Sequence, residues 1–167
     1  RNYRYVNLRY LNKRFFVFNS AIDNSDQSYK TFYMTEGDPG TSSLHMPRRF
    51  KIKKIIQVPC IKLSDFLSLI PWDRFPYIEH IKVDAQGNDL RILKSAGKYL
   101  ADRIVYVTAE TQACNQYSYS HSESELDHFM INKGFKIVPR TSVAGNKTYL
   151  NQKFERLSNK LDYSFLV

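Results

Sequence analysis

The sequence is short of cysteine and glycine, and it has no long apolar run. Its two cysteines, Cys60 and Cys114, offer neither a disulfide framework nor a metal-ligand spacing, which predicts a reducing compartment such as the cytoplasm. No stretch approaches the roughly 20 apolar residues of a membrane-spanning helix. Because 167 residues are enough to bury a substantial core, we expect one soluble domain over residues 1–167.

Positive charge is in excess, with a formal net charge of +9. This balance favours anionic partners such as nucleic acid, anionic glycans or phosphorylated compounds, without choosing among them. The basic residues are dispersed, and the alternation over 51–53 is typical of a solvated strand face. His121 and His128 are not at the i, i+4 spacing of a helical zinc pair, so no metal site is expected.

The order of predicted elements indicates an α/β fold. Alternating and β-branched runs predict strands, and periodic apolar stripes with capping residues predict helices. The expected strands span 15–22, 29–34, 55–61, 77–83, 104–109, 135–138, 147–150 and 163–167, the first two forming a hairpin. Helices are expected over 88–99, after a Ser122–Glu125 capping box, after a cap at Ser64 and, from a weaker pattern, over 3–12. The alternation of strands and helices predicts parallel strands at the centre of the sheet.

Two acidic residues stand where predicted buried strands end. Asp84 opens the turn Asp84-Ala85-Gln86-Gly87 after the strand 77–83, and Glu110 closes the strand 104–109. Because parallel strands of one βαβ unit end at the same sheet edge, the two carboxylates are expected to lie close together. One could then accept a proton or bind a hydroxyl while the other organises the pocket. The alternative is structural: these acids and Asn88 could cap helices, or the acids could pair with Lys82.

The most specific motif is Lys82-Val83-Asp84-Ala85-Gln86-Gly87, followed by Asp89, Leu90, Leu93, Lys94 and Ala96. It resembles the Lys-[Ile/Val]-Asp-x-Glu-Gly turn and Leu-x-x-Leu-Lys-x-Ala helix of the FkbM family of S-adenosylmethionine-dependent methyltransferases. Other segments similar to that family are Asn19-Ser20-Ala21-Ile22-Asp23, Phe32-Tyr33, Gly40-Thr41-Ser42-Ser43-Leu44 and the run from Val58-Pro59 to Phe66. The likeness covers nearly the whole chain.

The resemblance implies a Rossmann-like class I methyltransferase sheet with helices on both faces. It also implies transfer of a methyl group from S-adenosylmethionine to a hydroxyl of a sugar or small metabolite. Carried over residue by residue, it implies catalytic roles for Asp84, Gln86 and Glu110. The cofactor contacts that it implies come from Asn19, Ala21, Ile22, Asp23, Ser42, Ser43 and Gly87.

Two departures from the family pattern bear on function. The family's glycine-rich first loop and the first two strands of its sheet have no counterpart, and Gln86 replaces a glutamate, which removes a charge but keeps hydrogen bonding. Because the chain starts at Arg1 rather than Met, we expect an N-terminally incomplete catalytic domain that forms homo-oligomers through exposed sheet edges. The rival interpretations are a non-catalytic interaction or oligomerisation module and an RNA-binding or RNA-modifying protein, although nucleic acid is the less favoured partner.

Overall fold

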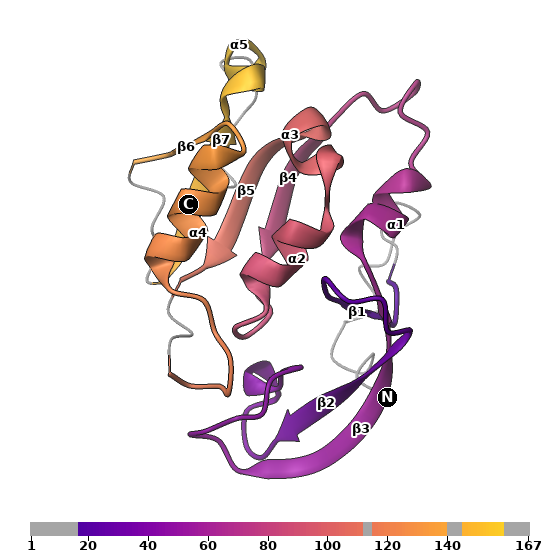
Figure 1. The fold of residues 1–167 in the computed structure, drawn as a ribbon, viewed down its shortest axis with the longest axis vertical. Coiled ribbons are helices and arrows are strands. Elements are labelled where there is room, and N and C mark those ends of the chain that lie inside the picture. Colours follow the sequence, from indigo (N-terminus) through magenta and orange to yellow (C-terminus); the bar gives the residue numbers. More distant parts are fainter. Residues whose placement is uncertain (1–16, 112–114, 140–144, 159–167) are drawn as a thin grey trace, which may run out of the picture.

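Strands and helices alternate along the chain in the computed structural model, which describes residues 17–111, 115–139 and 145–158 (Figure 1). The strands are β1 (Ala21–Ile22), β2 (Tyr29–Thr35), β3 (Ile52–Ile61), β4 (Ile78–Val83), β5 (Ile104–Glu110), β6 (Phe135–Ile137) and β7 (Asn146–Asn151). The helices are η3 (Pro39–Thr41), α1 (Leu63–Ser68), α2 (Asp89–Ser95), α3 (Lys98–Arg103), α4 (Glu123–Asn132), η4 (Gln152–Phe154) and α5 (Glu155–Ser158).

A four-stranded sheet with the order β4–β5–β7–β6 organises the fold. Strands β4 and β5 are parallel, with Val83 opposite Ala109, whereas β7 runs antiparallel to both of its neighbours. Strand β5 reads as an apolar run because it lies between two other strands and is buried from Ile104 to Val107. The parallel pair and the helices that follow it confirm the predicted α/β, Rossmann-like class.

Helices α1 to α4 share the main hydrophobic core with β4 and β5. Figure 1 shows α2 and α4 lying over this sheet, and their fully buried Leu93 and Met130 belong to one core cluster with Val107. A smaller cluster joins Tyr106 and Leu150 to apolar side chains of η4 and α5. Among the described helices, none combines the length and the apolar character that crossing a membrane requires.

A second sheet has the order β1–β3–β2 and forms the lower end of the molecule in Figure 1. Strands β2 and β3 pair antiparallel, from Tyr29 opposite Pro59 to Thr35 opposite Ile52, whereas β1 pairs parallel with β3. The predicted hairpin between residues 15–22 and β2 is therefore wrong, and β1 has only two residues. The ten-residue β3 takes both partners, one at each edge, and this choice depends on contacts between distant segments.

The helix predicted over 88–99 is two helices in the structure. Helix α2 ends before Gly97, whose φ of +59° is tolerated best by glycine, and α3 begins at Lys98. The N-cap of α1 is Lys62 rather than Ser64, which lies inside the helix. The capping box that opens α4 at Ser122 is confirmed. The predicted segments 3–12 and 163–167 lie outside the described residues.

The two sheets are not joined by hydrogen-bonded strands. In the described ranges β4 pairs only with β5, and no strand lies between β1 and β4. In a class I methyltransferase sheet the first two strands separate the third strand from the fourth, and the described strands of this chain include none at that place. The edge of β4 beside the turn at Asp84 consequently has no strand neighbour there.

Candidate active site

The turn after β4 holds its backbone in the left-handed region. Gln86 has φ of +52° and Gly87 has φ of +93°, and the former costs a non-glycine residue roughly 1–2 kcal/mol. The Oγ of Ser43 donates a hydrogen bond of 2.8 Å to the carbonyl oxygen of Gln86. A Cβ on Gly87 would lie 3.1 Å from the carbonyl oxygen of Tyr119. Contacts from two distant loops therefore fix this turn.

Three of the predicted site residues meet at the carboxyl edge of the sheet. The Nε2 of Gln86 donates hydrogen bonds to Asp84 Oδ1 at 3.1 Å and to Glu110 Oε2 at 3.3 Å. The register of β4 with β5 brings the two carboxylates together, because Val83 and Ala109 are paired just before them. A neutral amide fits between two acids better than a third carboxylate would, since it donates hydrogen bonds without adding like charge.

The surroundings of Glu110 change its proton affinity. Burial, followed by the neighbouring charges of Asp84 and Asp89, raises the pKa of Glu110 from 4.5 to about 7. Asp84 is more exposed, with 44% of its side chain accessible, and it pairs with Lys82 at 3.2 Å. Glu110 is therefore the group of this pair that exchanges a proton near neutral pH.

Tyr117 completes the cluster, although no sequence pattern predicts its role. Its hydroxyl lies 2.8 Å from Gln86 Oε1 and 2.9 Å from the carbonyl oxygen of Thr41, and its side chain is 1% exposed. Because the hydroxyl donates to the amide oxygen, the amide nitrogen of Gln86 faces the two carboxylates. Tyr117 lies in an irregular loop where no periodicity marks a buried residue, so only the tertiary contact identifies it.

A cavity of about 340 Å³ lies next to this cluster. Five predicted site residues line it: Ala21 and Ile22 of β1, Ser42 after η3, and Asp84 and Gln86 of the turn. Asn88, 1% exposed, links the walls by donating to the carbonyl oxygen of Ile22 at 2.9 Å. The side chain of Asn88 forms no capping hydrogen bond at α2. The structure thus brings residues from three distant segments around one hollow.

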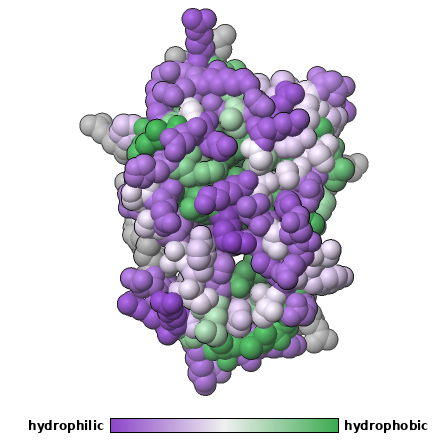
Figure 2. Space-filling view, viewed as in Figure 1, coloured by the Kyte–Doolittle hydropathy of each residue, from purple (hydrophilic) through white to green (hydrophobic). Residues whose placement is uncertain are grey.

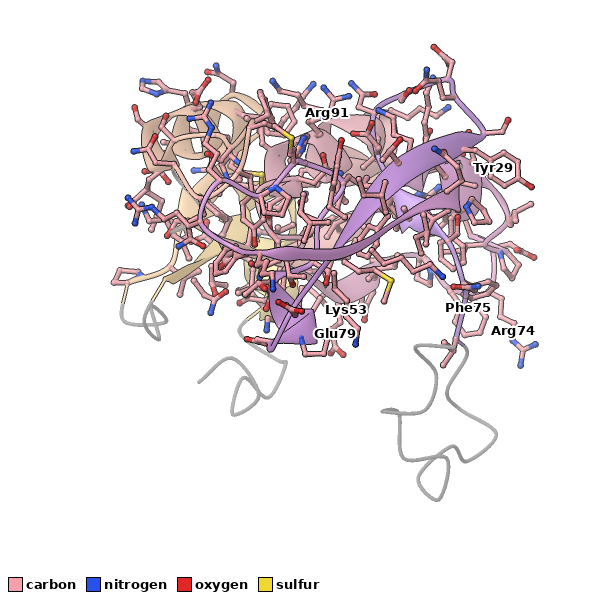
Figure 3. The ribbon with its side chains drawn as sticks, turned by 90° about the horizontal axis from the view of Figure 1, so that it is seen from below. Tyr29, Lys53, Arg74, Phe75, Glu79 and Arg91 are labelled. Atoms are coloured by element: carbon pink, nitrogen blue, oxygen red, sulfur yellow. The ribbon has the colours of Figure 1, made fainter. Side chains whose placement is uncertain are left out.

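Asp23 and Asn19, which are also predicted to contact the cofactor, do not line this cavity. Asp23 is 1% exposed, and its carboxylate receives two hydrogen bonds from Arg91, at 2.6 and 3.0 Å, and one from Lys30 at 2.8 Å. These cations hold the pKa of Asp23 well below its usual range, against the opposing effect of burial. Figure 3 shows Arg91 on the side of the molecule opposite Arg74 and Phe75. Asn19 lines a neighbouring groove rather than this cavity.

S-adenosylmethionine, which the resemblance implies, fits this arrangement only in part. The apolar Ala21 and Ile22 suit a wall against an adenine ring, and Asp84 suits the side where an acceptor would lie. The sequence has no Gly-x-Gly turn, and the described residues place no strand beside β4 to carry such a turn. We therefore assign no residue to the methionine and ribose parts of the cofactor.

Comparison with known proteins agrees with the geometry of the turn. The family model described as the methyltransferase FkbM domain matches residues 4–137, which include the Asp84 turn, Glu110 and Tyr117. Neither the curated proteins nor the solved structures yield a match. Because the family match spans well over half of the sequence, the chain belongs to the FkbM methyltransferase family.

Proposed function

We propose that this member of a methyltransferase family is an O-methyltransferase that acts on a hydroxyl of a sugar or small metabolite, with S-adenosylmethionine as the methyl donor. The observation that carries the proposal is the pair of carboxylates, Asp84 and Glu110, held by one amide beside a cavity. A hydroxyl acceptor must lose its proton as it is methylated, so the site needs a group that accepts a proton near neutral pH.

Each of the three side chains has a distinct role in this proposal. Glu110, with a pKa of about 7, takes the hydroxyl proton through Asp84, because Asp84 lines the cavity and Glu110 does not. Asp84 lines the cavity and orients the hydroxyl by accepting its hydrogen bond. Gln86 keeps the two carboxylates at a fixed separation. When bound, S-adenosylmethionine supplies an electrophilic methyl group on a sulfonium.

The test uses the full chain, tritiated S-adenosylmethionine and a panel of hydroxylated acceptors that contains both glycosides and apolar hydroxy acids. Asp84→Asn and Glu110→Gln should lower methyl transfer by about 10²–10⁴-fold, the usual contribution of a general base. Glu79→Gln is the matched control, because Glu79 is an exposed acid on β4 that does not line the cavity. In the unsubstituted chain the rate should rise with pH as Glu110 loses its proton, whereas full activity of Glu110→Gln would contradict the proposed base.

A second candidate is a methyltransferase-like module without catalysis. The observation that favours it is the absence of a glycine-rich cradle from the sequence, together with the open edge of β4 among the described strands. Calorimetry with S-adenosylmethionine separates the two, because only the enzyme should release heat and gain thermal stability with the ligand. A cytoplasmic location and association through sheet edges also remain proposals.

A further inference from the structure

A groove of about 520 Å³ adjoins the candidate active site along the β2–β3 hairpin. Phe32 and Ala21 line both the groove and the cavity beside Asp84, so the two hollows are neighbours on the surface. Figure 2 shows apolar side chains gathered at the lower end of the molecule, where the hairpin lies. A molecule whose reactive end lies at Asp84 would therefore extend along the hairpin.

The strand register determines which hairpin side chains reach the groove. Phe32 is opposite Ile56, and Met34 is opposite Lys54, so these four share one face of the ladder. All four line the groove, and the three apolar ones are partly buried. The other face carries Ile55, which is 56% exposed, and Tyr29, whose ring points away from the molecule in Figure 3. One face of the hairpin thus supplies Phe32, Met34 and Ile56 as an apolar floor to the groove.

Positive charge is distributed unevenly along that floor. At the end near β1, Lys30 is neutralised by its ion pair with Asp23. At the other end, Lys54 is exposed and forms no ion pair with any described residue. Lys54 lies two residues along the strand from Ile56, a rise of about 7 Å. Because Ala21 of β1 is paired with Cys60, six residues along β3 from Lys54, an anionic group on a ligand would be attracted to the groove end remote from β1.

We propose that this groove binds the body of the methyl acceptor, and that the acceptor is a hydroxylated metabolite with an apolar body and a carboxylate remote from the hydroxyl. The inference deepens the proposed function and rests on it, because the hydroxyl is placed at Asp84. A neutral oligosaccharide fits the groove less well, since the apolar floor offers it no hydrogen bonds. The polar side chains that line the groove are Asn19, Ser20, Gln57 and Lys54. Burial of an apolar body against the side chains of the floor contributes favourable binding free energy. Attraction between its carboxylate and Lys54 adds to it.

Binding is tested by NMR on the full chain with carbon-13 in its methionine methyl groups. The sequence has three methionines: Met34 lines the groove, Met46 is exposed elsewhere and Met130 is fully buried in the core. The probes are ω-hydroxylauric acid, its methyl ester and maltotriose. The free acid should shift the Met34 signal alone and bind more tightly than the ester, whereas maltotriose should leave Met34 unchanged. The Met130 signal reports whether each variant is folded.

Two pairs of adjacent residues provide matched variants. Lys54→Glu should weaken binding of the free acid by about threefold to tenfold at low salt, while Lys53→Glu should leave it within about twofold. Ile56→Gln should weaken the binding of both acid and ester by about tenfold, and Ile55→Gln should not. Lys53 and Ile55 do not line the groove.

Three results would overturn the inference: no shift of Met34, an equal effect of the two lysine variants, or a response to maltotriose as strong as to the acid. A Met46 shift as large as that of Met34 would also overturn it, by indicating non-specific association. If the unsubstituted chain binds the free acid at Met34 but methylates no acceptor, the proposed function fails while the groove assignment stands.

Discussion

Replacing Glu110 with glutamine should stabilise the fold at alkaline pH and leave its stability nearly unchanged at acidic pH. Burial and the charges of Asp84 and Asp89 raise the pKa of Glu110 from 4.5 to about 7, so the folded protein holds this proton more tightly than the unfolded chain. Stability therefore decreases as pH rises between these two values. Glutamine removes the charge and keeps an oxygen that can accept the hydrogen bond from Gln86.

The magnitude follows from the displacement of that pKa. At 1.36 kcal/mol per pKa unit, a change from 4.5 to about 7 corresponds to about 3 kcal/mol for a fully desolvated group. Glu110 is only partly buried, and solvent screening reduces this energy. We therefore expect Glu110→Gln to raise the free energy of unfolding by about 1–2 kcal/mol at about pH 8.5. At about pH 4 the native carboxyl is already protonated, and the gain should vanish.

The assay is urea unfolding at these two pH values, with the free energy obtained by linear extrapolation. Comparing variant with unsubstituted protein cancels the titration of other groups, and Glu79→Gln controls for the loss of an acid elsewhere on β4. A gain of equal size at both pH values, or no gain at about pH 8.5, would refute the electrostatic account of Glu110. The carboxylate would then be well solvated and unsuited to the role of a neutral-pH base.

Three further predictions concern the framework of the site. Tyr117→Phe removes a buried hydroxyl that donates to the turn, and it should lower the unfolding free energy by about 1–2 kcal/mol in urea titrations. Arg91→Gln leaves the buried Asp23 with one cation, Lys30. It should lower the free energy of unfolding by about 2–3 kcal/mol at neutral pH, as measured by thermal unfolding. Because Asp23 has a lowered pKa, that cost should diminish as pH falls below about 4, and a cost independent of pH would contradict the ion pair. Gly87→Ala should be more destabilising than Gly37→Ala in the same assay, because both glycines have positive φ but only Gly87 has a backbone oxygen against its missing Cβ.

The predictable parts of the fold were those that depend on neighbouring residues. The apolar run of β5 predicts a strand buried on both faces, and the Ser122–Glu125 spacing predicts the start of α4. The hairpin partner of β2 was mispredicted because strand pairing is decided by segments far apart in the chain. The break at Gly97 was missed because one glycine is compatible with a helical pattern until packing selects its φ.

The candidate site also combines residues that local sequence predicts with contacts that only the folded chain shows. Its acids were found from sequence because a strand end is a local feature, and parallel strands necessarily end at one edge. The sequence did not predict Tyr117, the hydrogen bond from Gln86 to Glu110 or the ion pair between Asp23 and Arg91. Each depends on a side-chain contact across at least 24 residues of chain.

By itself, the sequence determined the α/β class, the position of the acidic turn and membership of the FkbM methyltransferase family. These follow from periodicity and motif spacing, which act within a few residues. Only the tertiary structure decided that a neutral amide joins Asp84 to Glu110, that the pKa of Glu110 is raised to about 7, and that a groove lined by Phe32, Ile56 and Lys54 adjoins the cavity beside Asp84. Proton affinity and cavity shape depend on burial and on charges that folding brings together, and neither is a property of any one segment of the chain.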